Sequence, residues 1–210
     1  VAGHLVRLNP DGALDSSFAS APAWQGEINQ ILQDGDGRLW VLGHGQGEAG
    51  RQPRLQRREA AGTLDSTFAP TWSDDAKLNG LALDAAGNVL VVGRFTSFDG
   101  QARTNLVRLS PDVAVDPAFS VPAAAEAGEL TCVAVANDGR IAIGGVATNV
   151  FATTFLRVLK SDGTRDPEFS PFSGPGSPLM RVAFDSGGDL LTVEHFLLTS
   201  SYWTPDHFSR

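Results

Sequence analysis

The sequence has little of several things that mark common classes of protein. Its single cysteine, Cys132, allows no internal disulfide and no cysteine-based metal cluster. No apolar run approaches the roughly 18 residues of a membrane span. The net charge of −8 argues against a protein that binds nucleic acid or an anionic membrane, because both need a positive field. We therefore expect no nucleic-acid partner and no membrane insertion.

Catalytic signatures are also missing. The sequence holds no H-E-x-x-H motif and no G-x-S-x-G elbow. The glycine-rich stretch "GHGQGEAG" at 43–50 lacks the Lys-Ser/Thr that follows in a phosphate loop, and it leads into no helix. No catalytic residue, metal site or cofactor is indicated.

An internal repeat dominates what is present. The phrase "LVRLNPDGALDSSF" at 5–18 returns at 55–68, 106–119 and 156–169. A second phrase, "INQILQDGDGRLWVLGH" at 28–44, returns at 78–94, 130–145 and 179–195. The period is about fifty residues, which predicts one repeat domain over 1–210. We place its units at about 5–54, 55–105, 106–155 and 156–205, with 206–210 starting a further repeat.

The stretch "QDGDG" at 33–37 has two possible interpretations. Alternating aspartates are typical of a calcium loop, and Asp-Gly is typical of a hairpin turn. In the other copies Asp36 becomes Ala86, Asp138 and Gly187, whereas the following glycine is kept. The pattern favours a turn that needs a residue at positive φ. A calcium-stabilised repeat remains an alternative.

Each unit predicts several short strands and no helix. The run "NVLVVG" at 88–93 suits a strand that is covered on both faces. Four antiparallel strands in forty to fifty residues are typical of a β-propeller blade. We therefore expect an all-β fold of about four four-stranded blades, with the fourth strand ending at the repeated phenylalanine. We expect that phenylalanine to wedge between blades and the repeated aspartate to cap a turn.

Ring closure has two possible outcomes. The ending "HFSR" at 207–210 aligns with "HLVR" at 4–7, so in a closed four-blade ring residues 5–8 and 206–210 would compete for one place beside 190–194. We expect instead an open arc or part of a larger ring, with 206–210 paired to its own blade and neighbouring repeats or domains of the same polypeptide beyond it.

The phrases "RLNPDGALDSSF" and "LALDAAGNVLVVGRF" resemble the delta-60 repeat, a bacterial β-propeller repeat of unknown function. The resemblance covers nearly the whole chain, with departures at Val113, which replaces a turn glycine, and Val158, which replaces a strand arginine. It implies a segment of a large exported protein, and hence an extracellular or cell-surface setting.

Candidate ligand-binding residues lie in the long, divergent loops, which we expect on one face. Exposed aromatic side chains in such loops suit flat ligands, and we select Trp24, Trp72 and Trp203 with Arg94. The alternative is that the rings fold back over a blade edge.

The histidines offer a second set of candidates. His44, Arg94, Gly145 and His195 align in one column of the repeat, which a closed ring would bring together. Two histidines are too few for a zinc site, so both stay weak ligand-binding candidates.

The sequence favours a non-enzymatic interaction or spacer module whose partner is an unknown protein or glycan. The first alternative is a glycan-active hydrolase or lyase at the propeller mouth. That enzyme would need two carboxylates facing one cleft, and nothing in the spacing of the loop carboxylates selects a pair.

Overall fold

Strands and turns make up the computed structural model, which describes residues 5–19, 26–47, 50–119, 121, 128–147, 153–170, 172–175 and 179–194. In chain order the strands are β1 (Gly26–Gln33), β2 (Leu39–Gly47), β3 (Gly50–Arg58), β4 (Lys77–Leu83), β5 (Val89–Arg94), β6 (Ser97–Phe98), β7 (Gln101–Ala102), β8 (Leu106–Leu109), β9 (Gly128–Val135), β10 (Ile141–Ala147), β11 (Thr153–Leu159), β12 (Phe172–Pro175), β13 (Leu179–Phe184) and β14 (Leu190–Glu194). These ranges contain no helix, and accordingly none that is long and apolar enough to cross a membrane. The prediction of an all-β fold is confirmed.

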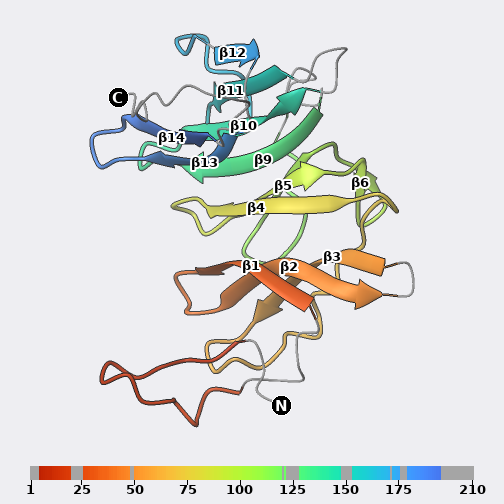
Figure 1. Cartoon of the computed structure of the whole chain (residues 1–210), viewed down its shortest axis with the longest axis vertical. Helices are drawn as coiled ribbons and strands as arrows, with labels where there is room; N and C mark the ends of the chain where they lie inside the picture. The colour runs from red at the N-terminus through yellow and green to blue at the C-terminus, as the bar shows by residue number, and fades with distance from the viewer. Residues whose placement is uncertain are drawn as a thin grey trace, which may run out of the picture.

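Four antiparallel sheets follow one another along the chain, and we number them as blades. Blade 1 is β1-β2-β3, blade 2 is β4-β5-β8, blade 3 is β9-β10-β11-β12 and blade 4 is β13-β14. The short strands β6 and β7 form a separate hairpin between β5 and β8. Figure 1 shows the blades stacked along the longest axis, from blade 1 in the lower half to blades 3 and 4 at the top.

The fourth strand lies elsewhere than the sequence suggested. The segment that ends at each phenylalanine makes only one bridge to the third strand, such as Arg58 with Leu64. The ladder ends there because the next residue, Asp65, accepts a hydrogen bond from the Thr67 amide at 2.9 Å and turns the chain away. In blade 3, β12 begins after the phenylalanine and pairs with β11. Among the described residues, only blade 3 has four strands.

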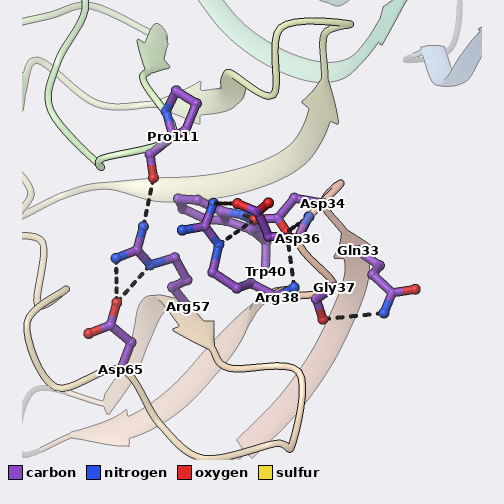
Figure 2. A network of polar contacts seen from close by, with 9 residues as sticks. All are labelled: Gln33, Asp34, Asp36, Gly37, Arg38, Trp40, Arg57, Asp65 and Pro111. Atoms are coloured by element: carbon purple, nitrogen blue, oxygen red, sulfur yellow. Dashed lines mark hydrogen bonds and ion pairs between the residues drawn. The ribbon is translucent and has the colours of Figure 1, made fainter.

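The structure of the hairpin turn at 33–38 distinguishes between the two interpretations of "QDGDG", a calcium loop and a turn. Gly37 has φ +80° and its amide donates to the Asp34 carbonyl at 3.0 Å. The Asp34 carboxylate accepts from the amides of Asp36 at 3.1 Å and Arg38 at 2.9 Å, and from the Arg38 Nε at 2.9 Å. Trp40 Nε1 also donates to it, at 3.3 Å (Figure 2). The stretch is a turn, as the glycine column indicated.

Alternate residues of each second strand face opposite neighbours. In blade 2, Val89 and Val91 pack in the cluster shared with blade 1, whereas Leu90 and Val92 pack in the cluster shared with blade 3. All four side chains are 0% exposed. A strand covered on both faces needs apolar side chains throughout, which explains the continuous Val/Leu run.

The repeated phenylalanines lie between blades, as expected. Phe68 belongs to the cluster between blades 1 and 2, and Phe119 to the cluster between blades 2 and 3. Phe18 packs on the turn of blade 1, where a Cβ added at Gly62 would come within 2.8 Å of the Phe18 ring. The interpretation of these rings as wedges is confirmed.

Residues 5–18 form the N-terminal hairpin, closed by a bridge between Leu8 and Leu14. The hairpin lies against blade 1, where the Ala19 amide donates to the Ala61 carbonyl at 2.8 Å. In the described part of the chain, β14 pairs with β13 and not with residues 5–8. Figure 1 places the hairpin and β14 at opposite ends of the molecule. The described blades therefore form an open array, and the expected pairing of 206–210 lies outside the described residues.

Candidate binding site on the long-loop face

Two long connections meet beside blade 1 and blade 2. They are the segment from Phe68 to β4, and the β6–β7 hairpin between β5 and β8. The first of them and β3 border a depression of about 610 Å³, lined by Gln52, Pro53, Pro70, Thr71, Trp72, Ser73 and Asp74. The turns joining first to second strands lie at the other ends of these strands, so this depression belongs to the long-loop face.

Hydrogen bonds fix the loop that forms one wall of this depression. The Thr71 amide donates to the Asp99 carboxylate at 2.7 Å, and the Asp99 amide donates to the Thr71 carbonyl at 3.0 Å. The Thr96 amide donates to the Ser73 hydroxyl at 3.1 Å. Asp99 has φ +45°, the left-handed region that Asp tolerates in tight turns. The wall is therefore held by contacts to blade 2.

Trp72 differs from the exposed anchor that the sequence suggested. Its ring makes edge-on contacts with Phe98 at 4.8 Å and Phe95 at 5.3 Å, and the side chain is half-buried against the core between blades 1 and 2. The prediction of a substantially exposed side chain is wrong for Trp72. The ring folds back over the blade edge, because Phe95 and Phe98 form an apolar surface on which it packs. Its remaining surface lines the depression.

Arg94 and His44 occupy the corresponding ends of β5 and β2. The Arg94 side chain is 43% exposed, and its guanidinium donates to the Asp75 carbonyl at 3.3 Å. His44 Nδ1 lies 3.1 Å from Asn29 Oδ1. The strand register pairs Arg94 with Lys77, His44 with Glu27 and Val146 with Glu129. The third member of this column is thus Val146, which corrects the alignment that placed Gly145 there.

Three of the candidates, Trp24, Trp203 and His195, lie outside the described residues. Within the described ranges, no group of three or more His, Cys, Asp or Glu side chains is arranged to hold a metal ion. Cys132 is buried, 3% exposed, and burial raises the pKa of its thiol. It belongs to the core cluster between blades 3 and 4.

A second depression, of about 450 Å³, lies among the short turns of blades 1 and 2. Asp34, Asp36 and Asp84 line it together with Arg38. Burial raises the pKa of Asp34, but the hydrogen bonds from Arg38 and Trp40 outweigh burial and lower the pKa overall. Asp36 forms an ion pair with Arg38 at 2.8 Å, and Asp84 accepts from the Asn88 side chain at 2.8 Å. These carboxylates hold their own turns.

An arginine clamp between blades was missed in the sequence analysis. Arg57 Nε donates to Asp65 Oδ2 at 2.7 Å, and Arg57 Nη1 donates to the Pro111 carbonyl of the next blade at 2.8 Å (Figure 2). Arg7 makes the same contacts with Asp15 and the Ala60 carbonyl. The corresponding contacts of Arg108 are with Asp116 and the Ser161 carbonyl. The sequence signal is the arginine at the third position of the first repeated phrase, which is kept in three of its four copies as Arg7, Arg57 and Arg108.

First-strand side chains form a second set of ties. Every first strand is irregular at the same position, occupied by Asn29, Asn79, Thr131 and Met180. Asn79 Nδ2 donates to the Leu130 carbonyl at 2.8 Å, and Thr131 Oγ1 donates to the Leu179 carbonyl at 2.6 Å. A bulge re-aims the side chain, and at Asn79 and Thr131 it points to the backbone of the next blade.

Comparison with known proteins agrees with this architecture. Residues 1–18, 87–119 and 136–169 match a family model described as a β-propeller domain of unknown function (DUF5122). The fold is a β-propeller fold. The matched residues cover three of the four copies of the first repeated phrase, at 5–18, 106–119 and 156–169. In the last two segments the match also covers β5 and β10. The family model thus agrees with the blade unit but assigns it no activity.

One similar solved structure is a gluconolactonase from Xanthomonas campestris. It shares 16% identity with the propeller chain at a TM-score of 0.52, and the match covers 90% of this chain and 61% of that structure. Identity this low supports the fold alone, and the chain spans less than two thirds of that structure's length. The search of curated proteins found no match.

Proposed function

We propose that this chain is a non-enzymatic interaction module of a large exported bacterial protein, and that it binds a glycan or a protein on the long-loop face. The observation that carries the proposal is the depression of about 610 Å³ beside Trp72. It combines a fixed aromatic ring and two prolines with amide, hydroxyl and carboxylate side chains. Apolar surfaces with a few placed polar groups are typical of binding sites.

The lining favours binding over hydrolysis. Asp74 is the one carboxylate among the described residues that line the depression, whereas a glycosidase needs a pair facing one cleft. The neighbouring Asp75 interacts with Arg94 through its carbonyl, and its carboxylate lies 3.9 Å from the guanidinium. A glycan-active hydrolase or lyase is therefore the weaker candidate.

Membership of the delta-60 repeat and an extracellular setting belong to the same proposal. They are supported by the residues shared with that repeat and by the match to a β-propeller family. A calcium-stabilised repeat is less well supported, because the Asp34 carboxylate already accepts four hydrogen bonds.

The test is a screen of the purified chain against immobilised oligosaccharides and peptides. For each ligand found, binding is compared with that of the Gln52→Ala and Asp74→Ala variants, which alter the lining of the depression. Asp112→Ala is the matched control, since Asp112 is an exposed carboxylate in a short turn of blade 2. We expect the first two substitutions to weaken binding at least several-fold and the control to leave it unchanged.

Two results would contradict the proposal. Cleavage of a bound glycan on prolonged incubation would show that the module is an enzyme. If no ligand binds, or if Gln52→Ala and Asp74→Ala bind as the wild type does, the long-loop face is not the binding site and a spacer role gains support.

A further inference from the structure

The depression on the long-loop face lies at the place where blade 3 has its fourth strand. Aligning Phe68 with Phe169 places residues 52–53 of β3 at 153–154 of β11, and places 71–74 on β12. In blade 3 these two stretches pair directly as antiparallel strands. In blade 1 the same two stretches line the depression. The depression is therefore the position of a fourth strand that the chain's own segment does not fill.

The segment 71–74 is held away from β3 because its backbone groups bond elsewhere. The Thr71 amide donates to the Asp99 carboxylate, and the Thr71 carbonyl accepts from the Asp99 amide. The Ser73 carbonyl accepts from the Ala76 amide at 3.0 Å. On the other side, Pro53 has no N–H to donate, whereas its equivalent in β11 is a threonine. The ladder that closes blade 3 is thus open in blade 1.

The outer edge of β3 presents backbone groups on the side of this opening. Each residue of an antiparallel strand directs its N–H and C=O to one edge, and successive residues alternate between the edges. The Arg57 carbonyl accepts from the Asp65 amide, so it points away from β2. The register of β2 with β3 is regular throughout. The Pro53 carbonyl and the N–H and C=O of Arg51 therefore point the same way as the Arg57 carbonyl.

We propose that this edge receives an extended peptide segment of a partner protein, which adds to blade 1 as its fourth strand. The inference rests on the proposed function, and it names the class of ligand for the same depression. β12 shows that an extended chain fits the equivalent place in blade 3. Strand addition gains affinity from backbone hydrogen bonds, and alternate side chains of the peptide supply selectivity.

The side chains of the depression indicate which peptides fit. Trp72 and two prolines, Pro53 and Pro70, supply its apolar surface, and Asp74 supplies an exposed carboxylate. An apolar side chain of the peptide packs on the first group, and a basic side chain lies beside Asp74. Alternate residues of a strand face the same side, so the two side chains are two positions apart. A peptide antiparallel to β3, as β12 is to β11, ends beside Asp74 and carries its basic residue near the C-terminus.

The first test uses an immobilised library of acetylated and amidated hexapeptides. Its members have valine, isoleucine or threonine at alternate positions, and either lysine or glutamate next to the C-terminal residue. We expect members with lysine to bind and members with glutamate not to bind. Asp74→Asn should weaken the binding of lysine members at least several-fold. Asp112→Asn, in an exposed short turn of blade 2, is the matched control and should leave binding unchanged.

The second test asks whether the peptide pairs through its backbone. The tightest lysine peptide is resynthesised with N-methyl groups on one alternate set of residues or on the other. We expect the set that faces β3 to lose at least tenfold in affinity and the intervening set to lose much less. In hydrogen exchange followed by NMR, the peptide should slow exchange of the Arg51 amide at least tenfold. The Thr154 amide is the control, because β12 already occupies its edge.

The outcomes separate this inference from the proposed function on which it rests. If oligosaccharides bind in a manner sensitive to Gln52→Ala and no peptide binds, the inference is overturned and the binding module remains. Equal losses from the two methylated sets, or an unchanged Arg51 amide, would also overturn it, since the ligand would then be held by side chains alone. If neither peptides nor oligosaccharides bind, the proposed function fails as well.

Discussion

Replacing Arg57 with alanine should destabilise the protein strongly, because this guanidinium connects two blades from a buried position. The Arg57 side chain is 11% exposed and that of Asp65 is 7% exposed, and Nη2 lies 2.5 Å from Oδ2. The substitution leaves the Asp65 carboxylate without its cation and the Pro111 carbonyl without its donor. Removing one partner of a buried pair costs about 3–5 kcal/mol.

We expect about 3 kcal/mol for Arg57→Ala, at the lower end of that range, because Thr67 still donates two hydrogen bonds to Asp65. For a chain of this size such a loss corresponds to roughly 6–12 °C in melting temperature. Urea unfolding followed by tryptophan fluorescence measures it. Arg57→Lys should recover only part of the stability that Arg57→Ala loses, since an ammonium cannot make both contacts in one plane.

Arg7 provides a matched control in the same chain. It makes the same two contacts, with Asp15 at 2.7 Å and the Ala60 carbonyl at 2.9 Å, but its side chain is 44% exposed. An exposed pair contributes about 0–1 kcal/mol, so Arg7→Ala should cost less than about 1 kcal/mol. Equal losses for Arg7→Ala and Arg57→Ala would show that burial does not determine the strength of the clamp, and the reasoning would fail.

Three further predictions concern the wedges, the turns and acid. Phe119→Ala should cost about 3–5 kcal/mol in urea unfolding, and Phe169→Ala less, because Phe169 is only partly buried; similar losses would contradict the wedge interpretation. Gly62→Val should cost about 2 kcal/mol more than Gly12→Val, since both have positive φ but only a Cβ at Gly62 meets other atoms, the Ala19 carbonyl oxygen at 2.7 Å and the Phe18 ring at 2.8 Å. The hydrogen bond from Thr67 lowers the pKa of the Asp65 carboxyl despite burial. The ionised Asp65 therefore stabilises the fold above about pH 4, and this stabilisation is lost as the pH falls through the lowered pKa. The difference in free energy of unfolding between wild type and Asp65→Asn should narrow between pH 7 and pH 3, and a constant difference would refute the assignment.

The repeat made the blades predictable because it places apolar side chains on strands and glycines at turns in every copy. The fourth strand was misplaced for a physical reason. The residues after each phenylalanine differ between copies, so no column marks β12, whereas the aspartate turn before it is conspicuous in sequence and forms only one bridge.

The candidate site was predictable in position more than in detail. The variable loops pointed to Trp72, but its ring packs on Phe95 and Phe98 of the next blade, and no local pattern reveals this contact. The arginine clamp was visible as a repeated residue, yet its target is a backbone carbonyl in the next repeat. Every residue has such a carbonyl, so the sequence does not single one out.

The clamps give the stack a direction. Each guanidinium reaches forward into the following blade, and the fourth copy of the phrase has Val158 in its place, 2% exposed. The junction beyond blade 3 is joined by apolar contact, by the Thr131 hydrogen bond and by the Arg140 guanidinium, which donates to the Gly188 carbonyl at 3.2 Å. This last guanidinium comes from the short turn before β10 and not from a third strand, so the tie to blade 4 differs from the clamps before it. The described stack is therefore not uniform, because one guanidinium–carbonyl contact recurs from unit to unit as far as blade 3 and a different set of contacts joins blade 4.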